Sequence, residues 1–210
     1  MPNRSIPLVG GACADDILEF IAKKRDQGQV IKLHPNGFLQ LPLSPNTTWR
    51  ESPLRLHVWT ERVQVRGDQR LVVHDHAHGI ESYVLDGVLR NTTYHIEETP
   101  DGGYVVLHSD GNGQLQPTGT PVSCVQNAST IISVGSRYYI PKGQFHSSLA
   151  ESPLVITVIH RSDIDVSYRP KVIAPFSHGN HDVVVDRSLD QQLAWEIIRE
   201  VEEKVRSAYH

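Results

Sequence analysis

A succession of short β-type runs in the middle of the chain is the feature that most constrains its fold. Between residues 54 and 168, segments such as LRLHVW, YVVLHS and PLVITVIH are rich in Val, Ile, Tyr and Thr, and Gly, Pro, Asn and Asp separate them. Many short strands at regular spacing are typical of an antiparallel sandwich or barrel. The stretch 109–128 is polar with several Gly and Pro, so we expect a long loop or an irregular hairpin there.

Both ends of the chain carry helical patterns instead. Residues 14–26, ADDILEFIAKKRD, combine an amphipathic face with an acidic first turn. From Ser188 onward, apolar residues recur at helical spacing over SLDQQLAWEIIREVEEKVRSAY, and Ser188 with Gln191 fits a capping box. We expect this long helix to pack on the barrel, and a contact in a homodimer is the alternative.

Length and charge limit the classes of function. The 210 residues carry a formal net charge of −4 without a basic cluster, which argues against nucleic-acid binding. No apolar run is long enough to span a bilayer, and the N-terminus lacks the apolar core of a signal peptide, so we expect a cytoplasmic protein without membrane association. Two cysteines with no motif spacing predict free thiols. We expect a single domain, with a leading helix and strand (1–50), a barrel core (51–170) and a C-terminal extension and helix (171–210).

A histidine-rich segment, HDHAHGIE at residues 74–81, is the first candidate for chemistry. In a strand, side chains two residues apart point to the same face, so His74 and His76 project together. His78 shares that parity if the strand continues. Such a pair makes half of a site for a divalent metal, whereas two histidines on the wet face of an edge strand are the alternative.

A second segment, GSRYYIPKGQFH at residues 135–146, makes the metal interpretation specific. Gly135, Pro141, Gly143 and His146 follow the pattern G-x5-P-x-G-x2-H. This pattern resembles the second conserved motif of the cupin superfamily up to its histidine. Ala150 stands where an asparagine often follows that motif.

The first cupin motif, roughly G-x5-H-x-H-x3-4-E-x6-G, is matched by Gly67, His74, His76, Glu81 and Gly87. The spacing from His76 to Glu81 fits, Gly67 lies one residue too far upstream, and Gly87 lies one residue too close to Glu81. The two motifs occur in the expected order within predicted β structure. The chain therefore resembles a metal-binding cupin.

The resemblance implies an all-β-dominated fold, the cupin double-stranded β-helix or jelly-roll barrel, with the two terminal helices added. It also implies that His74, His76 and His146, with Glu81 as a conditional fourth ligand, hold one divalent metal ion. Fe(II) is favoured, and Mn, Ni and Zn are alternatives. A second register would use His76 and His78 as the histidine pair. We favour the first register, because the second shortens the spacing to Glu81 below the cupin pattern.

A narrower resemblance covers roughly residues 54–160. Trp59, His74-Asp75-His76 and Leu85-Asp86-Gly87 look like the corresponding stretch of cysteine dioxygenases and related thiol dioxygenases. In the mammalian-type enzymes a cysteine near the place of Glu81 is cross-linked to a tyrosine. Glu81 excludes that cross-link here, which argues against cysteine as the substrate and leaves an oxygenase of the wider group as the expectation.

These resemblances predict a mononuclear non-heme Fe(II) dioxygenase that acts on a small organic molecule with dioxygen as co-substrate. Candidate catalytic residues are Glu81, Tyr83, Tyr139 and His160, and ordinary strand packing is the alternative for each of them. Glu81-x-Tyr83 also resembles the E-x-Y of cupin lyases. A non-redox isomerase, epimerase or lyase is therefore the second hypothesis, and a non-catalytic small-ligand-binding cupin is the third.

Overall fold

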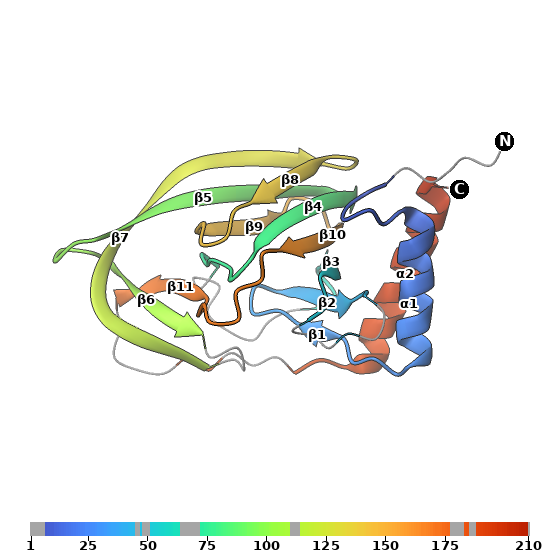
Figure 1. The fold of residues 1–210 in the computed structure, drawn as a ribbon, viewed down its shortest axis with the longest axis horizontal. Helices are drawn as coiled ribbons and strands as arrows, with labels where there is room; N and C mark the ends of the chain where they lie inside the picture. The colour runs from blue at the N-terminus through green and yellow to red at the C-terminus, as the bar shows by residue number, and fades with distance from the viewer. Residues whose placement is uncertain are drawn as a thin grey trace.

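The computed structural model describes residues 7–44, 47, 51–63, 72–109, 114–176, 183–184 and 188–209. Antiparallel strands make up most of this part, and the two helices lie side by side at one end (Figure 1). Gly67, the first glycine of the first motif, falls outside the described residues.

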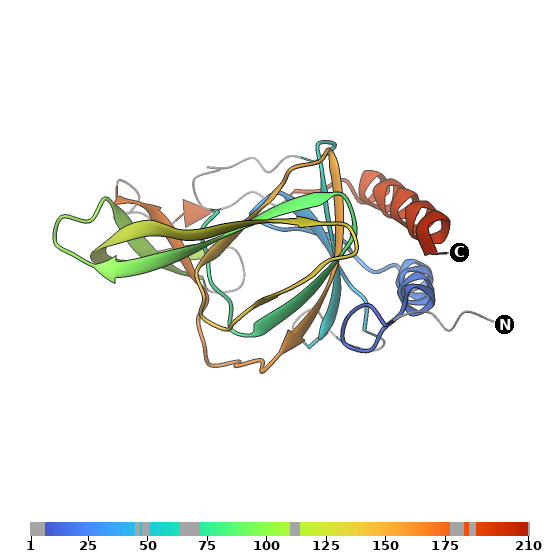
Figure 2. The ribbon, with the colours of Figure 1, turned by 90° about the horizontal axis from the view of Figure 1, so that it is seen from above.

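The strands form two antiparallel sheets. The first sheet has the order β1 (Lys32–Leu33), β2 (Phe38–Pro42), β3 (Leu54–Thr60), β10 (Leu154–Ser162), β4 (Gly79–Asp86) and β8 (Arg137–Ile140). The second has the order β11 (Lys171–Pro175), β6 (Tyr104–Ser109), β7 (Gln114–Ser133), β5 (Val88–Glu98) and β9 (His146–Ala150), with β12 (Val183–Val184) paired to β7. Seen from above, the strands wrap around a common interior (Figure 2). This double-stranded β-helix confirms the predicted cupin-type fold.

Of the two expectations for 109–128, a long loop and an irregular hairpin, the structure supports the hairpin. Residues 114–133 form β7, which pairs antiparallel with β6 across a register shift between Val105 and Leu107, and pairs with β5 on its other side. Its middle section is exposed on both faces, from Val125 to Ile131. A strand that buries neither face has no reason to alternate apolar and polar residues, so the pattern that identifies strands is absent from its sequence.

Alternation along the first sheet separates an inner face from an outer one. Leu56 and Val58 of β3 and Ile156 and Val158 of β10 belong to the core that both helices cover. Their neighbours in sequence, such as Trp59 and Val155, form a separate cluster with Phe38 and Leu89 on the barrel side. Side chains of β3 and β10 at odd numbers therefore face the barrel interior.

Helix α1 spans Ala14–Asp26, as the periodicity predicts. Helix α2 spans Gln191–Tyr209 and buries Ile197, Ile198 and Val201 against the sheet and α1. Its first turn differs from the prediction, because Asp190 Oδ1 accepts the backbone N–H groups of Gln192 and Leu193 at 2.8 and 3.3 Å. Asp190 therefore caps this helix in place of Ser188.

Neither described helix is long and apolar enough to cross a membrane. Cys13 and Cys124 are both free thiols, as predicted.

Candidate metal centre

The histidine-rich segment enters the barrel as an extended bridge between two strands. Backbone N–H groups of His74 and His146 each donate to the other residue's carbonyl oxygen, at 3.0 and 2.9 Å. On the other side, Asp75 N donates to Lys171 O at 3.0 Å and Ile173 N donates to Val73 O at 2.8 Å. Residues 73–75 thus join β9 to β11, the two edge strands in the path of the second sheet. The ligand segment is held on both sides by main-chain hydrogen bonds.

This bridge brings together three histidines. The candidate ligand atoms of His74, His76 and His146 all lie within 4.8 Å of one another. His76 Nε2 and His146 Nε2 are 3.0 Å apart. Two metal–nitrogen bonds of about 2.1 Å at a right angle would place their nitrogens roughly 3 Å apart, so this spacing fits a divalent metal between the rings. The first of the two predicted registers is the one that the structure assembles.

Hydrogen bonds fix which nitrogen of the His146 ring carries the proton. His146 Nδ1 lies 2.9 Å from Asn91 Oδ1, an oxygen that only accepts, so Nδ1 is the donor. The lone pair of this ring therefore resides on Nε2, the nitrogen that would bind a metal. His74 Nδ1 lies 2.9 Å from the carbonyl oxygen of Val72 and 3.1 Å from Asn36 Nδ2, and these contacts orient the His74 ring.

Electrostatics keeps the three rings neutral. Burial lowers the pKa of His146 well below its ordinary value, and the neighbouring His74 lowers it further. Burial also lowers the pKa of His74 and, together with the surrounding histidines, that of His76. Neutral imidazole is the form that binds a metal ion, so the donor set and its protonation state both fit the group that the motifs imply.

Asp75, between the two ligands, points away from them and anchors the segment. It is 1% exposed, accepts the N–H of Lys171 at 2.6 Å, and accepts a hydrogen bond from the Tyr168 hydroxyl. The alternation of His74, Asp75 and His76 thus follows the strand parity that the sequence predicts.

His78 is a neighbour of the group and not a member of it. Its ring centroid lies 5.2 Å from that of His76. Burial and the positive charges of Arg161 and Arg55 lower the pKa of His78 to about 3. His78 is thus a neutral ring beside His76 that the charges of Arg161 and Arg55 also reach.

Glu81 lies outside this group of three, so the structure does not assemble the four-ligand set that the motif implies. Strand parity gives the reason. Glu81 shares its face of β4 with Tyr83 and Leu85. Tyr83 and Leu85 pack in the core beneath the helices, and the Tyr83 hydroxyl lies 3.5 Å from that of Tyr209 on α2. Glu81 and Tyr83 therefore face away from the histidines.

Tyr139 and His160, the other candidate catalytic residues, also lie on outer faces. The side chain of Tyr139 is 58% exposed on β8. His160 shares the parity of Ile156 and Val158, and its ring packs beside Gly10. The structure does not bring either residue to the three histidines.

Asn91 is the site residue that sequence reasoning missed. It lies on β5 opposite Ser148 of β9, and Ser148 Oγ donates to its Oδ1 at 3.2 Å. No spacing between residues 91 and 146 is informative by itself, since only the pairing of β5 with β9 brings the two together.

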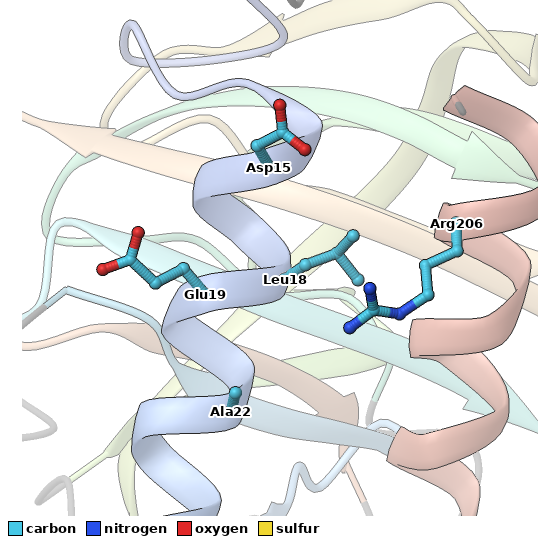
Figure 3. Close-up of a pocket in the computed structure, with 5 residues that line it drawn as sticks. All are labelled: Asp15, Leu18, Glu19, Ala22 and Arg206. Carbon is cyan, nitrogen blue, oxygen red and sulfur yellow. The ribbon is translucent and has the colours of Figure 1, made fainter.

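A separate pocket of about 430 Å³ lies between the helices (Figure 3). Asp15, Leu18, Glu19 and Ala22 of α1 and Arg206 of α2 line it. It belongs to the outer side of the first sheet and contains none of the candidate ligands.

Comparisons with known proteins concern the fold. No protein-family model matches the chain, and no curated protein matches it. Among solved structures, it is similar to Drosophila melanogaster CENP-C bound to CAL1, with 14% identity, a TM-score of 0.38 and coverage of 64% of this chain and 77% of that one. It is also similar to the DMSP lyase DddQ from Ruegeria pomeroyi, with 12% identity, a TM-score of 0.35 and 86% of each chain covered. A Klebsiella pneumoniae protein with a double-stranded β-helix domain has 16% identity, a TM-score of 0.25 and coverage of 68% and 88%.

Proposed function

We propose that this protein is a mononuclear non-heme Fe(II) dioxygenase that acts on a small organic substrate. The observation that carries the proposal is the group of His74, His76 and His146, neutral, buried or half-buried, and oriented from behind by Asn91 and Val72. Three facing nitrogens leave further coordination positions for a substrate donor and for dioxygen.

The composition of the ligand set supports an anionic substrate donor. Within the described residues no carboxylate joins the three histidines. Neutral ligands leave the charge of a divalent ion uncompensated, which favours a thiolate or enolate as the next ligand. The likeness of residues 54–160 to thiol dioxygenases points the same way. When bound, iron supplies the electron-transfer route by which dioxygen reacts with an organic molecule.

The chain itself positions the reacting groups. His74, His76 and His146 would hold the metal, and the hydrogen bond that Asn91 Oδ1 accepts keeps the His146 ring in the required tautomer. Buried Phe38, Trp59, Leu89 and Val155 form an apolar cluster on the barrel side, and Phe38 stacks on His34, whose ring lies 5.8 Å from that of His74.

Metal analysis and oxygen uptake test the proposal. Protein purified without added metal should contain close to one iron per chain, and a panel of small thiols and enediols should include one that drives oxygen consumption. His76→Ala and His146→Ala should lose both metal and uptake, whereas His95→Ala, an exposed histidine on β5, should keep both.

Two results would contradict the proposal in different ways. Bound zinc or nickel without oxygen uptake would favour the non-redox isomerase, epimerase or lyase. Unchanged metal content in His76→Ala and His146→Ala would show that the metal centre itself is misassigned.

A further inference from the structure

The ring of His76 differs from those of the other two candidate ligands in how it is held. Oxygens of Asn91 and Val72 lie behind the rings of His146 and His74, at Nδ1. The described contacts of the His76 ring are instead with neighbouring imidazoles, including His146 Nε2 at 3.0 Å. The place of His76 therefore depends on the main chain on either side of it.

The loop between β10 and β11, residues 163–170, holds that main chain on both sides of the ligand. Asp165 N donates to Ala77 O at 2.9 Å, directly after the ligand. The Tyr168 hydroxyl donates to Oδ2 of buried Asp75, directly before it. A displacement of this loop would therefore move the ligand's own backbone.

The same loop is tied to the turn that precedes His146. Lys142 Nζ donates to Asp165 Oδ2 at 2.6 Å. The next residue of that turn, Gly143, donates its N–H to His76 O at 3.1 Å. Asp165 thus connects the turn that leads into one ligand with the segment that carries the other.

A compact turn fixes the conformation of this loop. Asp165 Oδ1 accepts the N–H of Ser167 at 2.9 Å, the Ser167 hydroxyl at 2.6 Å and the N–H of Tyr168 at 3.2 Å, as in an Asx-turn. The ammonium nitrogens of Lys142 and Lys171 lie 5.5 and 5.4 Å from the centre of the Tyr168 ring, within the range of cation–π attraction. The turn and the two cations together hold the Tyr168 ring in one place.

We propose that Asp165 and Tyr168 are positioning residues that hold His76 at its distance from His146. The two ligands are 70 residues apart in sequence, and their Nε2 atoms are 3.0 Å apart. The loop bonds to the segments of both, so it fixes a separation that neither segment sets alone. Partners that orient ligands from behind govern metal affinity as well as geometry. The consequence for metal affinity rests on the proposed metal centre, whereas the positioning of His76 does not.

Zinc affinity of the full chain, measured by competition with a chromogenic chelator, tests the consequence for metal binding. Tyr168→Phe removes the hydroxyl that donates to Asp75, and Asp165→Ala removes both the turn and the link to Lys142. Each variant should bind zinc at least about tenfold more weakly than the parent. Asp165→Asn keeps an acceptor for the turn, and an ion pair at the surface contributes little, so this variant should recover most of the loss.

Matched changes elsewhere serve as controls. Tyr209→Phe removes a hydroxyl that donates to Tyr83 at 3.5 Å on the outer side of the first sheet. Asp86→Asn breaks a pair with Lys204 at 2.8 Å, also an aspartate–lysine pair at the surface. Both controls should bind zinc as the parent does. Equal losses in the loop variants and in the controls would reflect general stability and would overturn the positioning role.

Amide hydrogen exchange of metal-free protein reports on His76 without any metal. The N–H of Gly143, which donates to His76 O, should exchange at least about tenfold faster in Tyr168→Phe and in Asp165→Ala. The N–H of His146, held by a separate bond to the ligand segment, should exchange as in the parent. A local change of this kind distinguishes positioning from a loss of global stability, which would accelerate both amides.

The two measurements separate this inference from the proposed function. Unchanged exchange at Gly143 in both loop variants would overturn the inference, whether or not the protein binds metal. A loss of zinc affinity in Asp165→Asn as large as in Asp165→Ala would overturn the role of the turn. A parent that binds no zinc, together with faster exchange at Gly143 in both variants, would refute the proposed metal centre and support the positioning of His76.

Discussion

At the scale of single residues, Asn91 determines how well His146 can serve as a ligand. Its Oδ1 accepts the Nδ1–H of His146 at 2.9 Å. Without that oxygen the ring loses both its orientation and its tautomer preference. Asn91→Ala should weaken metal binding by about ten- to a hundredfold, as measured by competition with a chromogenic chelator. Asn127→Ala, an exposed asparagine on β7, should bind metal normally, and an equal effect of both changes would exclude this role.

His57 gives the protein a pH dependence that needs no metal. Burial, followed by the charges of Arg55 and Arg161, lowers its pKa well below the ordinary value of 6.5. Gln40 Nε2 lies 3.1 Å from His57 Nε2, so a neutral ring accepts the amide's hydrogen bond. As the pH falls below about 6.5, the unfolded chain takes up a proton before the folded one. The stability that neutral His57 contributes is therefore present above this pH and is lost as the pH falls toward the folded pKa.

Urea unfolding of metal-free protein at about pH 7, 6 and 5 measures this effect. His57→Gln should show a shallower loss of unfolding free energy than the parent, by at most about 1.4 kcal/mol per pH unit. His95→Gln, at an exposed position, should match the parent slope. Identical slopes for parent and His57→Gln would mean that His57 is not held neutral.

How far single residues can be predicted depends on whether their partners are near in sequence. His74 and His76 are two positions apart, and His146 belongs to a compact motif, so the sequence predicts the three as one group, and the structure brings their ring nitrogens within 4.8 Å of one another. Glu81 was placed by motif spacing alone, and the start of β4 at Gly79 sets a parity that turns it outward. Asn91 had no sequence signal, because it contributes only through strand pairing.

At the scale of elements, the corner between β4 and β5 depends on Gly87. Its φ is +79°, and a Cβ there would lie 2.3 Å from the carbonyl oxygen of Leu154. Gly119 on β7 has a similar φ of +78° but nothing within 4 Å of a Cβ. Gly119→Ala should cost about 1–2 kcal/mol for the left-handed conformation alone. Gly87→Ala adds a backbone clash and should cost at least twice as much.

Urea unfolding of the two variants tests this difference, and equal losses would show that the corner relaxes without cost. The comparison also bears on the fold prediction. Gly87 was read as part of a cupin motif, and the structure supplies the reason for glycine at this corner.

Elements were predictable where burial imposes a period on the sequence. Helix α1 buries Ile17, Leu18 and Ile21 on one face, and its bounds agree with the prediction. β10 buries both faces and reads as a continuous apolar run. β7 shows neither a helical period nor a continuous apolar run. Backbone pairing with β5 and β6 makes it a strand, and burial of its side chains imposes no period on its sequence.

At the scale of the whole molecule, the candidate metal centre lies where the second sheet is joined edge to edge. Residues 73–75 connect β9 to β11, and His76 reaches toward His146 of β9 from the segment that leads into the first sheet. A metal at this point would tie together parts of the chain about seventy residues apart. Because the unfolded chain does not assemble the three nitrogens, binding would stabilise the folded state selectively.

Metal loading should therefore raise the melting temperature of the whole protein. A free metal concentration a hundredfold above Kd adds about 2.7 kcal/mol, which for a domain of this size is roughly 5–10 °C. Scanning calorimetry of chelator-treated protein, with and without added zinc as a redox-inert ion, measures the shift. His146→Ala should show no shift, while His95→Ala should show the full one. An ion that binds only the folded state must stabilise that state. If added metal left the melting temperature of the parent protein unchanged, the three histidines would therefore serve packing and not metal binding.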